Sequence, residues 1–462
     1  MFHKLQFRMD GGFTEAELQG IKEDALGLLS DVGVRIDHEG ILKFLEAQRG
    51  LTRSGNRIRL SRDLVEEWLP VIRQKNYEYS YNRSDDAWRL VTPYMAAQFR
   101  DPAGGAVRPA TTEDQRLCVK LGEVLGMYGP EPLHVQEGPV EIRQLLSFKI
   151  ALEHSREIGG WAPAMNPVET RFMIEMGQAA GRKPPYGCME IPISPLRLNA
   201  ELLAMLFERR ERQDQLIGIV VGGGAAPMPG ATAPLSFPAC LSQGLAEALA
   251  AYIIPQVIDR RLLGYCSFGG FLFNLRTMDT FHPYFPESLM YGAMLRQVLQ
   301  YTLGRKFGHW FKPDFYANPG KLYQVGFAGA TDALLGARSI HVGAEKGDVL
   351  SPLNMVIAAD LLRHMRKYVE GLPLVHSATL TRELIEPGLE SGMYTDLEST
   401  LNYRELYVNP RLLFQHDSHE ALMAAAREEM NRLLALHDFA LPREAQAEME
   451  KVFASAQKAL VR

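Results

Sequence analysis

The sequence has few cysteines, and they show no metal-binding spacing. Its four cysteines are far apart and never form a Cys-x-x-Cys pair: Cys118, Cys188, Cys240 and Cys266. This arrangement argues against a disulfide framework or a cysteine-rich zinc site, so we expect a reducing, cytoplasmic location. The twelve histidines are scattered. His416 and His419 have a spacing that permits chelation, but no third ligand is evident, so we predict no bound metal.

A strong charge of one sign and a long apolar run are also missing. The 462 residues carry a formal net charge of −5, with a pI near 6.2. Without a basic excess, there is no electrostatic footprint for nucleic acid or for an anionic membrane. The apolar stretches are interrupted by polar residues or are as short as Leu216 to Val221, well below the roughly 20 residues of a membrane span. The N-terminus MFHKLQFRMDGGF lacks the apolar centre and the cleavage site of a secretion signal. We expect neither a nucleic acid nor a membrane partner.

What is present is ordinary globular composition, 46% hydrophobic and 23% charged, in a chain long enough for a large core and an added domain. Apolar residues at helical spacing predict a helix from Thr14 to Leu29, with Thr14 and Glu17 as a capping box. From Tyr77 to Ala110, alternating aromatics and turn residues indicate strands and turns. We therefore predict an N-terminal helical and small-strand extension over residues 1–110.

Beyond residue 110, short apolar segments alternate with helical ones. We predict seven strands, at Leu133–Gln136, Gly159–Ala164, Pro185–Ile191, Leu216–Val221, Leu263–Phe268, Lys306–Phe311 and Ser339–Val342. Helices are predicted between these strands, and several of them begin with a residue directly followed by proline, which suits the first helical position. These pairs are Asn166-Pro167, Ser194-Pro195, Asn318-Pro319, Ser351-Pro352 and Phe285-Pro286.

Seven or eight such units predict a (β/α)₈ TIM barrel over residues 111–417, although the eighth strand cannot be placed from the sequence. An open doubly wound sheet is the alternative. Residues 418–462 are predicted to form C-terminal helices that pack outside the barrel or against a second subunit of a homo-oligomer.

Three segments resemble the trimethylamine methyltransferase (MttB-like) superfamily. LLSDVGVRIDHEGILKFLE, from Leu28 to Glu46, is similar to the family's N-terminal helix, Gly-Val turn and second helix. GATAPLSFPACLSQGLAEALA, from Gly230 to Ala250, resembles its Gly-x-x-Ala-Pro loop and alanine-rich helix, and it is the most specific match. FKPDFYANPGKLYQVGFAGATDALLGARSIHVGA, from Phe311 to Ala344, resembles the region around Lys-x-Pro-Asp. The resemblance covers most of residues 14–420.

The chain departs from the family in two respects. It contains no pyrrolysine, which makes trimethylamine a poor guess for its substrate, and the loop from His341 to Asp348 is more charged than is usual in the family. Members without pyrrolysine resemble glycine betaine methyltransferases. That resemblance implies transfer of a methyl group from a small quaternary amine to the Co(I) corrinoid (cobalamin) of a partner corrinoid-binding protein. A quaternary ammonium leaves as a neutral amine, so the protein's task is to orient the methyl group and exclude water.

Active sites of TIM barrels lie where strands end and βα loops begin. The polar residues there that we predict to be catalytic are His134, Glu190, Lys312, Asp314 and His341. Those predicted to bind substrate are Gln136 and the aromatic residues Trp161, Phe268, Phe271, Trp310, Phe315 and Tyr316, because aromatic faces attract a quaternary ammonium. Gly222, Gly223 and Gly224 would let backbone approach a corrin ring, with His341 as a further contact.

Each of these residues also has an ordinary structural interpretation. The aromatic residues suit a barrel core, the carboxylates at loop starts suit helix caps, and the glycines suit a flexible turn. Two other classes of function also stay open. One is a non-catalytic protein that binds a quaternary amine or a corrinoid. The other is a barrel enzyme of different reaction type, in which His134, Glu190 or His341 would have perturbed pKa values.

Overall fold

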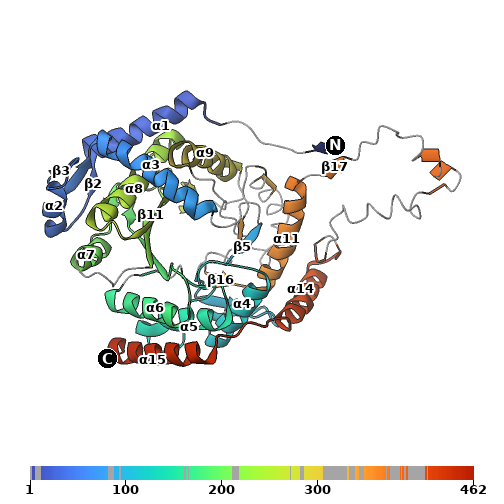
Figure 1. The fold of residues 1–462 in the computed structure, drawn as a ribbon. Helices are drawn as coiled ribbons and strands as arrows, with labels where there is room; N and C mark the ends of the chain where they lie inside the picture. The colour runs from blue at the N-terminus through green and yellow to red at the C-terminus, as the bar shows by residue number, and fades with distance from the viewer. Residues whose placement is uncertain are drawn as a thin grey trace.

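The structure is a computed structural model. It describes residues 3–5, 12–81, 88–92, 95–160, 163–164, 166–210, 218–270, 272–280, 286–304, 330–331, 334, 339–342, 348–370, 372–374, 385–386, 388–389, 392–393, 411–413 and 415–461. Figure 1 shows helices on the outside of the molecule and strands β5, β11 and β16 on the inside.

The helices are α1 (Glu15–Gly27), α2 (Glu39–Glu46), α3 (Arg62–Tyr81), α4 (Thr112–Val124), α5 (Arg143–His154), α6 (Pro167–Ala179), α7 (Ala200–Arg209), α8 (Phe237–Ile258), α9 (Pro286–Leu303), α11 (Pro352–Glu370), α14 (His419–Leu434) and α15 (Arg443–Leu460). The strands are β1 (His3–Leu5), β2 (Val34–Arg35), β3 (Leu51–Ser54), β4 (Arg57–Leu60), β5 (Arg89–Val91), β6 (Gln98–Arg100), β7 (Val107–Pro109), β8 (Gly187–Glu190), β9 (Pro192–Ile193), β10 (Arg197–Leu198), β11 (Ile219–Ala225), β12 (Leu263–Phe268), β13 (Phe273–Asn274), β14 (Asp279–Thr280), β15 (Ser339–His341), β16 (Val349–Leu350) and β17 (Leu372–Leu374). Two short helical turns, η1 (Leu28–Val32) and η2 (Val140–Ile142), complete the set.

The first helix begins as the sequence predicts. The backbone N–H of Thr14 donates to Glu17 Oε2 at 2.7 Å, and the N–H of Glu17 donates to Thr14 Oγ1 at 3.3 Å. This reciprocal capping box satisfies two backbone donors that would otherwise lack a partner at the start of α1.

A row of parallel pairings runs through the middle of the protein. β15 pairs with β5, Val91 of β5 bridges to Tyr128, and Gly129 bridges to Ile158. Pro163 then bridges to Cys188 of β8, and β8, β11 and β12 form a three-stranded sheet. Parallel pairings therefore connect β15, β5 and 128–129 to Ile158, and they connect Pro163, five residues later in the chain, to β8, β11 and β12. The mixed α/β architecture with parallel strands is confirmed.

The predicted strands differ in how fully they form. β8, β11, β12 and β15 confirm four of them. Within 133–136 and the described residues of 159–164, the pairings are the isolated bridges at Leu133 and Pro163. The predicted strand Lys306–Phe311 lies outside the described residues. β5 belongs to the parallel row although it falls within the predicted extension, so a domain boundary at 110 would separate β5 from the strands with which it pairs.

Three of the predicted proline-opened helices are observed, since α6, α9 and α11 begin at Pro167, Pro286 and Pro352. The prediction for Ser194-Pro195 is wrong. Those residues form the turn between the antiparallel strands β9 and β10, and the helix begins later, capped by Asn199. A cap-proline pair marks a chain reversal as readily as a helix start, because proline also suits turns. Asn318-Pro319 lies outside the described residues.

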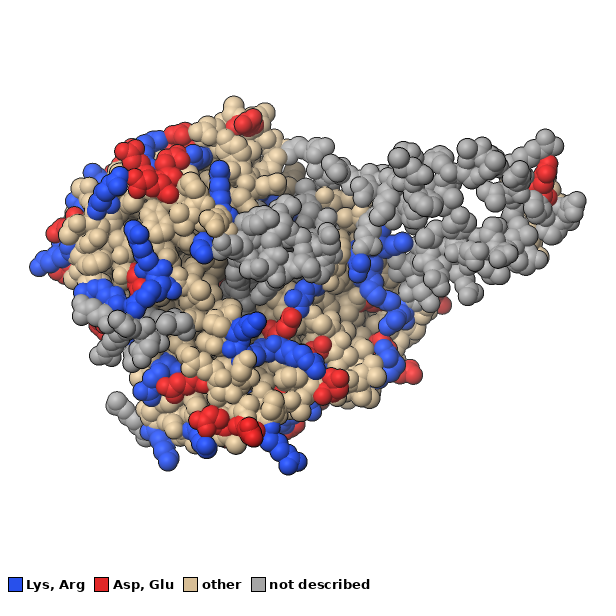
Figure 2. All heavy atoms as spheres, viewed as in Figure 1, with Lys and Arg blue, Asp and Glu red and all other residues tan. Residues whose placement is uncertain are grey.

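Two hydrophobic cores support the parallel row. One joins α1, α3 and α8 to β8, β11 and β12, and the other joins α4, α11 and α14 to β5 and β6. Among the described residues, α8 alone is long and apolar enough to cross a membrane, and 83% of its most apolar window is buried inside the protein. All four cysteines are buried and free, as predicted. On the face shown in Figure 2, basic and acidic side chains are interspersed.

Candidate functional site

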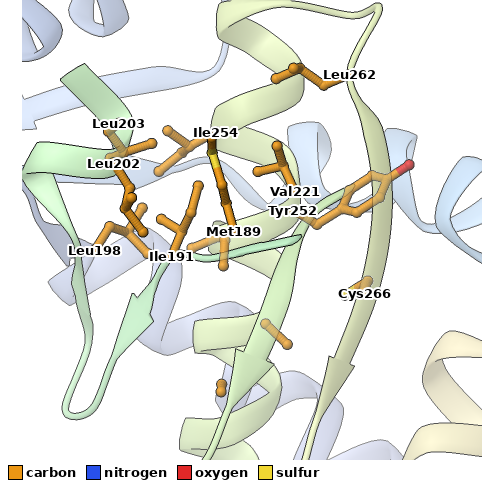
Figure 3. Close-up of a cluster of buried hydrophobic side chains, with 14 of the residues drawn as sticks. Met189, Ile191, Leu198, Leu202, Leu203, Val221, Tyr252, Ile254, Leu262 and Cys266 are labelled. Carbon is orange, nitrogen blue, oxygen red and sulfur yellow. The ribbon is translucent and has the colours of Figure 1, made fainter. Parts of the chain in front are cut away.

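The sheet formed by β8, β11 and β12 has two different faces. Met189, Val221 and Cys266 belong to the hydrophobic core on the face toward the helices, and Figure 3 shows Met189 and Val221 near Ile254 of α8. Because side chains alternate along a strand, the neighbouring residues point to the opposite, inner face of the sheet.

The inner face carries an acid, a phenol and two glycines. Glu190, Gly222 and Tyr265 lie opposite one another in the register of the three strands, and Gly224 lies opposite Ser267. A Cβ atom added at Gly222 would lie 2.8 Å from the ring of Tyr265, and one at Gly224 would lie 2.9 Å from the carboxylate of Glu190. The two glycines therefore make room for the side chains of the flanking strands.

The side chain of Glu190 is exposed, but the pKa of its carboxyl shows an effect of burial. Its side chain is open to solvent, yet desolvation by the surrounding protein raises the pKa of its carboxyl. Because the side chain is exposed, water screens the charge of this carboxylate. Within the described residues, its oxygens accept no hydrogen bond, so the carboxylate is available to a ligand.

A buried hydroxyl lies on the same inner face, on β12 opposite Gly224. The Oγ of Ser267 has no hydrogen-bond partner among the described residues, and the residue is 3% exposed. Gly222 and Gly224 are about 7 Å apart at the usual rise per residue, so the phenol and carboxylate that cover them lie a comparable distance apart. A buried polar atom without a partner requires an explanation, such as a bound water or a ligand.

Glu131 is a candidate site residue that the sequence analysis missed. It is 0% exposed, and neither carboxylate oxygen has a partner in the described part of the chain. Desolvation raises the pKa of this carboxyl to about 7, and the residue's own backbone N–H and then the charge of Arg182 partly oppose the rise. Glu131 and Glu190 both raise the pKa of the Cys188 thiol, after the larger effect of its burial, so the two acids flank the inner face. Its one sequence signal, an acid between Pro130 and Pro132, is too weak to identify it.

His134 and Gln136, both predicted as site residues, belong to the loop that follows the 128–133 segment. Burial, followed by the charge of Arg143, lowers the pKa of His134. The amide of Gln136 donates to the carbonyl of His134 at 2.8 Å and accepts from Arg143 at 3.3 Å. These local hydrogen bonds hold the loop in shape.

Three further residues near strand ends and loop starts support the fold. Phe268 is 1% exposed, and its ring lies over Gly244 of α8, which places it in the core on the helix side of the sheet. Glu137 accepts from the backbone N–H of Thr112 at 2.7 Å, and Asn166 caps α6. The two capping residues match their ordinary structural interpretation.

Several predicted site residues lie outside the described part of the chain: Trp161, Phe271, Trp310, Lys312, Asp314, Phe315 and Tyr316. For His341, the structure describes the backbone in β15, paired with Val91, and not the side chain. Within the described ranges, no group of three or more His, Cys, Asp or Glu side chains could hold a metal ion.

The loop after β11 is fixed by a buried network from α8. Glu247 is 1% exposed and accepts hydrogen bonds from Ser194 Oγ at 2.6 Å, from the N–H of Leu196 at 2.9 Å and from Gln243 at 2.8 Å. Gln243 also donates to the carbonyl of Thr232 at 2.9 Å. Burial raises the pKa of Glu247, and these hydrogen bonds oppose the rise. The glutamine and glutamate of the most specific sequence motif therefore join the loops that follow β9 and β11.

Comparisons with known proteins place this site in context. A family model described as trimethylamine methyltransferase (MTTB) matches residues 6–278. Glycine betaine methyltransferase of Desulfitobacterium hafniense (strain Y51) is 24% identical over 262 residues, 53% of this chain and 53% of that protein. The chain thus matches about half the length of this curated relative. The crystal structure of Methanosarcina barkeri monomethylamine methyltransferase aligns over 96% of this chain and 93% of that one, with a TM-score of 0.42 at 11% identity.

Proposed function

Because the chain belongs to the trimethylamine methyltransferase (MTTB) family, we propose that it is a methyltransferase that removes a methyl group from a small methylated amine, with the inner face of the sheet as the amine site. The observation that carries the proposal is the pair of side chains across β11, Glu190 on one side and Tyr265 on the other. A carboxylate balances a quaternary ammonium, and an aromatic face attracts it.

The proposed substrate is betaine-like, since the relative that matches is named for glycine betaine. In this arrangement Glu190 would hold the ammonium and Tyr265 would orient its methyl groups. The hydroxyl of Ser267 would donate to a substrate oxygen. With a neutral amine as the leaving group, none of these residues has to deliver a proton.

A Co(I) corrinoid on a partner protein would supply the nucleophile that accepts the methyl group. The inner glycines do not fit the direct contact with a corrin ring that we expected, because Tyr265 and Glu190 cover Gly222 and Gly224. We therefore assign Gly222 and Gly224 to packing within the sheet, and we propose no contact between the corrinoid and β11.

We also propose that the parallel row closes into an eight-stranded barrel. Lys306–Phe311 would be the strand between β12 and β15, and β5 would be the strand that sequence patterns could not place. On this view, the barrel begins near Arg89 rather than at residue 111.

The test mixes the purified protein, chemically reduced cobalamin and a panel of methylated amines, and follows methyl-Co(III) by absorbance. We expect turnover with at least one quaternary amine. Failure with the whole panel would refute the proposal, and binding of an amine without transfer would support a non-catalytic binding protein instead.

The variant Glu190→Gln tests the site itself. A cation about 5 Å from this carboxylate gains roughly 0.8 kcal/mol with the permittivity of water and about 3.3 kcal/mol at an effective value of 20. We expect the KM for the amine to rise between about fourfold and about 270-fold. Glu201→Gln removes the same charge from an exposed position in the first turn of α7 and should leave KM unchanged. Equal KM values for the two variants would remove Glu190 from the site.

A second candidate function is proton-transfer chemistry on the same face. The raised pKa values of Glu131 and Glu190 and the lowered pKa of His134 favour it. An amine substrate that exchanges a carbon-bound hydrogen with solvent deuterium, and forms no methyl-Co(III), would support this alternative.

A further inference from the structure

A cavity of about 550 Å³ lies at the opposite end of the parallel segments from Glu190. It is lined by Arg89, the first residue of β5, by Tyr128, by Gly159 and Gly160, and by Arg182 and Lys183 in the loop before β8. Arg89, Tyr128, Arg182 and Lys183 stand at or before the N-terminal ends of parallel segments, and the two glycines directly follow Ile158, which pairs with Gly129. The cavity is therefore separate from the proposed amine site, which lies toward the C-terminal ends.

Four of the five charged side chains that line the cavity are basic, and the fifth is Glu157. Arg89 pairs with Glu157 and stacks 4.5 Å from the centre of the Tyr128 ring, while Arg156 pairs with Glu123. In each of these two pairs, the glutamate neutralises the charge of the arginine. Arg182 is largely desolvated, and the charges of Glu123, Glu157 and Glu131 partly compensate its own. Lys183 is exposed and adds a further positive charge to the wall.

Arg182 is held in place with donors to spare. Its two terminal nitrogens donate to the carbonyls of Ser155 at 2.8 Å and Ile158 at 2.6 Å. Two of the five guanidinium N–H groups are thereby used. Lys183 is exposed, and within the described residues its ammonium makes no hydrogen bond or ion pair.

The backbone allows close packing at the floor of the cavity. Gly160 has φ of +95°, and a Cβ atom there would lie 2.3 Å from the carbonyl oxygen of Pro185. Glycine at this position lets the chain after Ile158 lie directly against Pro185, in the loop that also carries Arg182 and Lys183. The two basic side chains are thus presented from a tightly packed base.

We propose that this cavity binds a small oxyanion of the phosphate class between Arg182 and Lys183. A fixed guanidinium and a free ammonium suit a tetrahedral dianion, which accepts several charge-assisted hydrogen bonds at once. The site is independent of the methyl-transfer proposal, because it uses none of the residues on the inner face of the sheet.

The test is titration calorimetry of the full chain with inorganic phosphate, pyrophosphate and acetate at pH 8 and constant ionic strength. We expect phosphate and pyrophosphate to bind and acetate to bind more weakly. Lys183→Glu should raise the phosphate Kd about tenfold or more, and Lys183→Arg should keep it within about threefold. Lys458→Glu, the same charge change at an exposed position on α15, should have no effect.

Several results would overturn the proposal. These are no phosphate binding at millimolar concentration, equal Kd values for wild type and Lys183→Glu, or acetate affinity that matches that of phosphate. Because the measurement needs neither an amine nor a methyl acceptor, its outcome is independent of whether the chain transfers methyl groups. Thermal unfolding of each variant without phosphate checks that the substitutions leave the fold intact.

Discussion

Replacing Glu131 by glutamine should make the protein's stability less dependent on pH. Desolvation by burial raises the pKa of this carboxyl from 4.5 to about 7. A raised acid pKa means that the folded state keeps a proton that the unfolded chain releases. Stability is therefore full below about pH 4.5 and is lost as the pH rises toward the folded pKa.

The rise of this pKa from 4.5 to about 7 corresponds to roughly 3 kcal/mol, of which about 2.5 kcal/mol falls between pH 5 and pH 8. Glutamine has nearly the same shape and does not ionise. Urea unfolding at both pH values gives the free energy of unfolding. For Glu131→Gln, this free energy relative to wild type should be about 2.5 kcal/mol higher at pH 8 than at pH 5. Glu141→Gln, at an exposed position, is the control. If the difference between Glu131→Gln and wild type is the same at both pH values, Glu131 is not a buried acid without partners.

Two further predictions concern the packing around the site. Gly222→Ala should destabilise the protein by about 1–3 kcal/mol in urea unfolding, because the new Cβ would lie 2.7 Å from the backbone oxygen of Tyr265. Gly224→Ala should destabilise the protein by less than about 1 kcal/mol, because its new Cβ would meet only the movable carboxylate of Glu190. Displacing that carboxylate should raise the KM for the amine. Equal stabilities for the two glycine variants would contradict the register. Glu247→Ala leaves three donors without an acceptor and should cost at least about 3 kcal/mol, against about 1 kcal/mol for Glu247→Gln. Similar unfolding midpoints for these two variants would exclude the network.

Local patterns predicted local structure well. The capping box at Thr14, the helix starts at Pro167 and Pro352, and the strands at 187–190 and 263–268 each depend on neighbours within a few residues. The patterns also found the family, through short segments whose residue types repeat its motifs. They failed at Ser194-Pro195, where the same residue pair forms a turn between two strands.

The position of β5 could not be read from the sequence because its three residues, Arg89–Val91, carry no signal of their own. A strand so short is stabilised by its partners, here β15 from more than two hundred residues later in the chain. Only the folded chain supplies those partners. For the same reason, a domain boundary drawn from composition separated β5 from the strands with which it pairs.

The sequence by itself determined which residues are acidic, aromatic or glycine at the strand ends, and therefore which chemistry was available there. The tertiary structure decided which of them share a face. Strand register turns Phe268 toward α8 and sets Glu190 and Tyr265 over the glycines of β11. It also buries Glu131 away from any partner in the described residues. The reason is physical. Pairing between strands that are distant in the chain sets the side of the sheet to which a residue points and how far its side chain is desolvated on folding.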